Sequence, residues 1–230
     1  MEQLNAMVES QYHLNGLYED ILTRLGEQEV DIDEVSRKHI AGVDEFHVRG
    51  AEISQELARE IGLDNSKVLD VGCGIGGPSR MLADDYNCRV TGIDLSHEFI
   101  RTASALSELV GLQDKTDFIQ ASALELPFED GSFDVVWTQH VQMNISDKAK
   151  FYSEINRVLS DRGTFVYYDI FQKNGRMLIT RFRGQMMHRS AFLEAPRRWI
   201  ISFRSWDSRI YLQPIRLPRG PSSWLGFLIS

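Results

Sequence analysis

Between residues 66 and 171, short apolar runs alternate with longer segments whose apolar residues recur at helical spacing. This alternation constrains the fold more than any other feature of the sequence. Strands that alternate with helices of about 10–15 residues are typical of right-handed crossovers and of a parallel sheet covered on both faces. The pattern therefore predicts an α/β domain with a doubly wound, mostly parallel sheet. Expected strands cover residues 67–71, 88–93, 117–121, 133–138 and 164–171, and expected helices cover residues 78–86, 98–110 and 147–159.

Residues 1–65 show no strand pattern and are predicted to form a helical leader. Apolar side chains recur at helical spacing from Leu4 to Leu25. A second helix is expected over residues 53–61, ending at Gly62, after an acidic loop over residues 26–38. We therefore divide the chain into this leader, an α/β core over residues 66–171, and a C-terminal segment over residues 172–230.

The composition is that of a globular chain, with 43% hydrophobic and 25% charged residues among 230. No apolar run approaches the roughly 20 residues of a membrane-spanning helix. The first residues lack the basic start and apolar stretch of a secretory signal. Cys73 and Cys88 have no partners at metal-ligand spacing. We therefore expect a cytoplasmic protein without a disulfide framework or a metal site.

The charge of the chain changes near Phe171. Residues 1–170 carry 14 Lys and Arg against 31 Asp and Glu, whereas residues 171–230 carry 11 against 2. Three of the four tryptophans and four of the six prolines also lie in this last part. One interpretation is an antiparallel hairpin over residues 198–206 and 210–217 that completes the sheet. Another is a tail that was replaced by a change of reading frame near residues 171–176.

A third interpretation takes the basic tail as a nucleic-acid-binding extension. The arginines are interleaved with apolar residues and match no RNA-binding motif, and the rest of the chain is acidic. We therefore expect no nucleic-acid partner.

The strongest local signal is the segment VLDVGCGIGGPSR at residues 68–80, where a strand runs into a glycine-dense turn that opens a helix. Glycines let a ligand approach the backbone and meet the amides of the helix N-terminus. Gly72, Gly74 and Gly77 also satisfy G-x-G-x-x-G, so a dinucleotide site in an NAD-dependent oxidoreductase is the competing interpretation.

Two carboxylates distinguish these interpretations. Asp70 lies in the turn region, where it would repel a pyrophosphate but attract an ammonium group. Asp94 ends the second expected strand, where a carboxylate can accept hydrogen bonds from both hydroxyls of a ribose. A ligand with a ribose, an ammonium group and no phosphate suits both residues. S-adenosylmethionine is such a ligand, and Asp70 and the long leader disfavour the oxidoreductase.

Four motifs then carry a resemblance to a known family: DVGCGIGGPSR at 70–80, GIDLS at 92–96, LPF with GSFDVV at 126–136, and EINRVL at 154–159. With these motifs, and with HVRG at 47–50, the chain resembles class I S-adenosylmethionine-dependent methyltransferases. It is most similar to the small-molecule branch that includes sterol, tocopherol, sarcosine/dimethylglycine and phosphoethanolamine methyltransferases. The resemblance covers roughly residues 44–171 and implies a Rossmann-like fold with S-adenosylmethionine as cofactor.

The resemblance also implies roles for single residues. The turn glycines would line the methionine part of the cofactor, Asp94 would hold the ribose, and the residues after the second and third strands would flank the adenine. Ser122 stands where the family commonly has an acidic residue, so it would accept the adenine amino hydrogen bond more weakly. The expected cofactor-binding residues are Asp70, Gly72, Gly74, Gly76, Asp94, Leu95, Ser122, Ala123, Leu124 and Gln139.

The segment WTQH at residues 137–140 ends the fourth expected strand, which faces the methyl group in this fold. His140 has the intrinsic pKa, about 6.5, of a general base, although it would equally serve to shape the pocket or bind the substrate. Asp169 would hold a cationic acceptor or cap the next turn. Tyr12 and Tyr18 would close over the cofactor or pack on the domain, and His47 and Arg49 would touch the cofactor or pair on the surface.

The sequence thus predicts a methyltransferase that acts on the nitrogen, oxygen or activated carbon of a small molecule. If the basic tail binds nucleic acid, the alternative is an RNA methyltransferase or a non-catalytic binder. The sequence does not identify the acceptor, because acceptor contacts would come from the leader and the C-terminal segment. It does not indicate the oligomeric state either.

Overall fold

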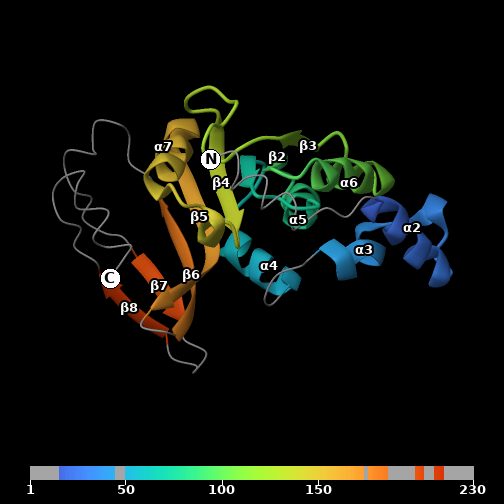
Figure 1. The fold of residues 1–230 in the computed structure, drawn as a ribbon, viewed down its shortest axis with the longest axis horizontal. Coiled ribbons are helices and arrows are strands. Elements are labelled where there is room, and N and C mark those ends of the chain that lie inside the picture. Colours follow the sequence, from blue (N-terminus) through green and yellow to red (C-terminus); the bar gives the residue numbers. More distant parts are fainter. Residues whose placement is uncertain (1–15, 45–49, 174–175, 186–199, 205–209, 215–230) are drawn as a thin grey trace. The chain divides into compact units, whose positions relative to one another are not determined.

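The computed structural model describes residues 16–44, 50–173, 176–185, 200–204 and 210–214, and Figure 1 shows its ribbon. The chain forms two compact units, Met1–Glu125 and Leu126–Ser230. In the described residues, no helix combines the length and the apolar character that a membrane span requires.

The first unit contains a three-stranded parallel sheet with β2 (Arg89–Asp94) between β1 (Lys67–Val71) and β3 (Thr116–Gln120). Four consecutive residues of β1, from Val68 to Val71, are buried. A strand that is buried on both faces is expected in a parallel sheet, because its crossover helices cover both faces. All three strands begin and end within one residue of the predicted bounds.

Two helices connect these strands. α5 (Gly77–Asp85) links β1 to β2 and contacts β2, whereas α6 (His97–Leu109) links β2 to β3 and contacts both of these strands (Figure 1). The Ser96 hydroxyl caps α6 by accepting the Phe99 N–H at 3.3 Å, which satisfies one of the free donors of the first turn. α6 stops before Gly111, whose φ of 71° ends the helix.

The described part of the leader is helical, as predicted. It comprises α2 (Leu17–Glu27), the 3₁₀ turn η1 (Ile32–Glu34), α3 (Arg37–Asp44) and α4 (Gly50–Ile61). Ile21 and Leu25 of α2 pack in one buried cluster with Leu106 of α6. The prediction of an acidic loop over residues 26–38 was wrong in part, because the end of α2, the turn η1 and the first two residues of α3 lie within this range. Tyr12, His47 and Arg49 lie outside the described residues.

The second unit contains β4 (Phe133–Gln139), which runs parallel to β5 (Leu159–Lys173), with η2 (Gln142–Asn144) and α7 (Lys148–Val158) between them. Three antiparallel strands follow: β6 (Arg176–Gln185), β7 (Ile200–Arg204) and β8 (Ile210–Pro214). β7 and β8 lie within the two segments expected to form a hairpin, and Ile200 pairs with Pro214.

β5 departs from the prediction at its start. The sequence indicated a turn at residues 161–163 and a strand from residue 164, but β5 already begins at Leu159. Phe133 pairs with Leu159 and Val135 with Thr164, so residues 160–163 form an irregularity inside the strand. Gly163 permits it, because a Cβ there would lie 2.7 Å from Leu159 Cδ2.

Candidate functional site

The glycine-rich turn after β1 is held in place by its own backbone. Gly72, Gly74 and Gly76 have φ values of 74°, 54° and 82°, a left-handed region that favours glycine. The N–H groups of Gly72 and Cys73 both donate to the Ile93 carbonyl oxygen, at 2.8 and 2.9 Å. The turn is therefore anchored to the end of β2, where the second motif of the sequence lies.

Asp94 joins this turn directly. The Gly74 N–H donates to Asp94 Oδ2 at 3.1 Å, and the Ser96 N–H donates to Asp94 Oδ1 at 2.9 Å. Burial raises the pKa of the Asp94 carboxyl, and these backbone N–H groups offset part of that effect. A Cβ at Gly74 would meet no atom within 4 Å, so the backbone of the turn is open to a ligand beside a fixed carboxylate.

Asp70 lies at the base of the turn. Its side chain is buried, with the residue 2% exposed, and its Oδ2 accepts the Ser79 hydroxyl at 2.6 Å. This bond ties the end of β1 to the first turn of α5. The sequence analysis gave Ser79 no role. Its position about one helical turn beyond the glycines was the signal that could have identified it as a partner of Asp70.

Two glycines of the site are required by packing. A Cβ at Gly76 would lie 2.7 Å from Phe118 Cζ, and a Cβ at Gly92 would lie 2.7 Å from Phe118 Cδ1. The Phe118 ring of β3 thus fills the space that both glycines leave. Cys73 belongs to the same buried cluster, and burial raises the pKa of its thiol well above the usual value. Cys73 is therefore a small core residue whose burial disfavours the nucleophilic thiolate.

The residues expected beside the adenine lie on two loops that are tied together. The Gln120 side-chain amide donates to the Leu95 carbonyl at 2.8 Å, and the Ala121 N–H donates to the Asp94 carbonyl at 3.0 Å. Leu95, Ser122, Ala123 and Leu124 are all half-buried. The Ser122 hydroxyl accepts the Leu124 N–H at 3.2 Å, which leaves it further acceptor capacity.

His140, in the second unit, has a backbone conformation that is uncommon for a residue with a side chain. Its φ is 57°, its N–H donates to the Tyr168 carbonyl at 2.8 Å, and its ring meets the Tyr168 ring edge to face at 5.3 Å. Such a conformation persists where the surroundings fix it, often at functional sites. Gln139 precedes it and accepts the Trp137 indole N–H at 3.0 Å.

The segment after His140 is fixed by Asp169 and by two residues, Lys148 and Tyr152, to which the sequence analysis gave no role. Asp169 is fully buried and accepts the Gln142 N–H at 2.7 Å. The Lys148 ammonium group donates to the carbonyls of Gln142 and Ile145. The Tyr152 hydroxyl donates to the Gln142 side chain. Burial lowers the pKa of Lys148, against the attraction of Asp169, and burial raises that of Tyr152. Asp169 was expected at the end of its strand, but β5 continues to Lys173.

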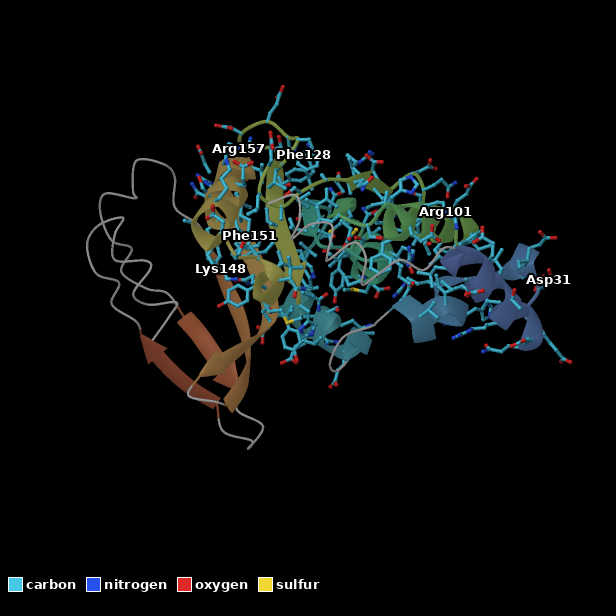
Figure 2. The ribbon with its side chains drawn as sticks, in the orientation of Figure 1. Asp31, Arg101, Phe128, Lys148, Phe151 and Arg157 are labelled. Carbon is cyan, nitrogen blue, oxygen red and sulfur yellow. The ribbon has the colours of Figure 1, made fainter. Side chains whose placement is uncertain are left out.

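A further polar cluster fixes the loop before β4. Arg157 on α7 donates to the carbonyls of Phe128 and Leu126, at 2.6 and 2.8 Å (Figure 2). Glu154 accepts from Arg157 at 2.8 Å and from the Leu126 N–H at 2.9 Å. The motif at residues 154–159 therefore has a structural basis, since it holds the LPF segment in place.

A glycine turn follows the first parallel strand, a carboxylate ends the second strand, and tied loops lie beyond it. This arrangement is typical of α/β domains of the class I methyltransferase type. Comparison with known proteins agrees, because residues 69–167 match the family described as the methyltransferase domain. The fold of residues 69–167 is therefore of the class I methyltransferase type, and the cofactor of this class is S-adenosylmethionine. The fold class and the family resemblance expected from the sequence are confirmed.

The similar proteins include enzymes that act on small molecules. The 2-methyl-6-phytyl-1,4-hydroquinone methyltransferase of Synechocystis sp. is 42% identical over 130 residues, which are 55% of this chain and 40% of that protein. The sarcosine/dimethylglycine N-methyltransferase of Halorhodospira halochloris is 33% identical over 124 residues, which are 54% of this chain and 44% of that protein.

A solved structure is also similar. Phosphoethanolamine N-methyltransferase 2 of Haemonchus contortus, in complex with S-adenosyl-L-methionine, has a TM-score of 0.50 and 27% sequence identity, and the match covers 53% of this chain and 28% of that chain. The present chain spans less than half the length of the curated relatives that it matches.

Proposed function

We propose that this chain is an S-adenosylmethionine-dependent methyltransferase that modifies a nitrogen, oxygen or activated carbon of a small-molecule acceptor. The hydrogen bond from the Gly74 N–H to Asp94 Oδ2 carries the proposal. It joins two sequence motifs into one site, with an open backbone next to a carboxylate. The acceptors named for similar proteins, a hydroquinone and sarcosine or dimethylglycine, support a small molecule as the substrate.

The residues of the first unit suit this cofactor. Each Asp94 oxygen accepts one backbone N–H and keeps acceptor capacity for a ribose hydroxyl. Leu95, Ala123 and Leu124 offer half-buried apolar surface to the adenine. Asp70 is already bound to Ser79, so it would favour the ammonium group through its field or through a bridging water. Gly72, Gly74 and Gly76 allow the backbone shape that the methionine part requires.

When bound, S-adenosylmethionine supplies an electrophilic methyl group on a sulfonium. Transfer from it is an in-line displacement, so the chain mainly aligns the acceptor and keeps water out. His140 would take a proton from an acceptor whose nucleophile is protonated, and its fixed backbone supports such a role. With an acceptor that is already nucleophilic, His140 would instead shape the pocket.

Calorimetric titration with S-adenosylhomocysteine tests the cofactor site. We expect Asp94→Ala to weaken binding by about 1–3 kcal/mol, because a charged hydrogen-bond acceptor is lost. Asp117→Ala is the matched control, since Asp117 is an exposed aspartate on the neighbouring strand β3. An unchanged affinity in the Asp94 variant would exclude the assignment of the ribose site.

A further inference from the structure

A fully buried arginine lies next to the glycine-rich turn. Arg80, in the first turn of α5, has a side chain that is 0% exposed. Arginine is almost never buried to this degree unless it is paired. The cofactor site described above assigns it no role.

The guanidinium of Arg80 joins three elements of the first unit. It forms a two-point contact with Asp44 at the end of α3, with Nε–Oδ2 at 3.2 Å and Nη2–Oδ1 at 2.5 Å. Nη2 also donates to the Ile75 carbonyl, within the turn, at 2.7 Å. Nη1 donates to the Ala103 carbonyl and the Ser107 hydroxyl of α6, at 3.1 and 3.4 Å.

The end of α3 approaches the turn closely enough to require a glycine. A Cβ at Gly77 would lie 1.7 Å from the Asp44 carbonyl oxygen, closer than any side chain permits. The Asp44 side chain is itself only 3% exposed. The leader helix α3 is therefore packed against the start of α5, and its carboxylate neutralises the buried guanidinium.

We propose that Arg80 is a positioning residue for the cofactor turn, and that through Asp44 it makes cofactor binding depend on the leader helix α3. This inference rests on the proposed function. Ile75 lies between Gly74, whose N–H reaches Asp94, and Gly76, which caps α5. A donor on the Ile75 carbonyl fixes the plane of the Ile75–Gly76 peptide, inside the turn. Its loss would loosen the turn, and with it the bond between the Gly74 N–H and Asp94.

The structure supplies a matched control. Arg37 also connects α3 to α5, through Asp84 at 2.9 Å and through Asp85, but these partners lie at the opposite end of α5 from the turn. Arg37→Gln therefore weakens the attachment of α3 without touching the turn. It separates positioning of the turn from general docking of the leader.

The main test replaces the pair by apolar residues, as Asp44→Leu with Arg80→Met, because buried ion pairs often tolerate such a replacement without loss of folding. Thermal unfolding verifies that the variant is folded. Calorimetry then measures the dissociation constant of S-adenosylhomocysteine, and hydrogen exchange follows residues 71–77. We expect at least a tenfold weaker affinity and faster exchange in the turn, with β3 unchanged. Arg37→Gln should match the wild type in both measurements.

Arg80→Lys is the second variant, and it replaces the double variant if that one does not fold. An ammonium group keeps the charge opposite Asp44 but cannot span Asp44 and Ile75 with a planar fork. We expect its affinity to lie between those of the wild type and the double variant.

The outcomes distinguish this inference from the proposed function. A wild type that binds no S-adenosylhomocysteine overturns both. A wild type that binds, with a double variant of equal affinity, overturns the inference alone. An equal loss in Arg37→Gln also overturns it, because the effect would then belong to the docking of α3 in general.

Discussion

At the scale of single residues, the site depends on carboxylates that are fixed by donors from their own unit. Asp94 is bound by two backbone N–H groups and Asp70 by a hydroxyl. Glu154 follows the same principle in the second unit, where it accepts from Arg157 and from the backbone of Leu126. Such carboxylates keep one orientation, which a binding site requires.

Glu154 yields a pH-dependent prediction. Its hydrogen bonds with Arg157 lower the pKa of the Glu154 carboxyl from its ordinary 4.5 to about 2. Because the folded pKa is lowered, this stabilisation is fully present above pH 4.5 and is lost as the pH falls from 4.5 to 2. We expect Glu154→Gln to lower the free energy of unfolding by about 1–3 kcal/mol at pH 7.

Urea unfolding at several pH values measures this effect. The difference between Glu154→Gln and the wild type should shrink as the pH approaches 2. Glu129→Gln, at an exposed position in the adjoining loop, should behave like the wild type throughout. A difference that stays constant with pH would show that the lowered pKa does not contribute to folding.

At the scale of secondary-structure elements, Gly77 at the start of α5 determines how closely the end of α3 packs against α5. Gly77→Ala would place its Cβ on the Asp44 carbonyl, so we expect it to lower the free energy of unfolding by about 1–3 kcal/mol. Gly42→Ala, in α3 itself, is the control, since a Cβ there meets nothing within 4 Å. It should raise stability by about 0.5–1 kcal/mol, because alanine is the better helix former. Equal effects in thermal unfolding would contradict the close contact.

The elements that sequence could predict are those with local signals. β1, β2 and β3 are apolar runs bounded by turns, and their ends were predicted to within one residue. α3 was missed because it is only eight residues long and buries only two of them, Ile40 and Asp44. β6 was missed because its arginines alternate with apolar residues, and this pattern was interpreted as part of a frame-altered or nucleic-acid-binding tail instead of a strand.

The candidate site shows the same limit. Asp94 and Gly74 could be found from their places after strands, since parallel strands bring such places to one edge. Arg80 could not be given its role, because its burial depends on Asp44, thirty-six residues earlier in the chain. His140 gave no sign of its left-handed backbone, which glycine or asparagine would have indicated.

At the scale of the whole molecule, the chain changes character where its family match ends. Residues 69–167 match the methyltransferase domain, and from residue 171 onward 11 basic residues face only 2 acidic ones. In the described part of this segment, β6 pairs antiparallel with β7, and β7 pairs antiparallel with β8. The antiparallel pairing is the one that a closing hairpin requires, and the abrupt change of charge is the one that a change of reading frame would produce.

The gene itself distinguishes these two interpretations. A frame change near residues 171–176 would leave the original tail encoded in another frame, so translating the two alternative frames past codon 171 should reveal an acidic continuation with helical periodicity. In that case we would expect the chain to bind S-adenosylhomocysteine while its methyl transfer is impaired, because the acceptor contacts expected from the original tail would be missing. Stop codons soon after codon 171 in both frames would instead establish the basic segment as the original one, because no alternative tail would be encoded.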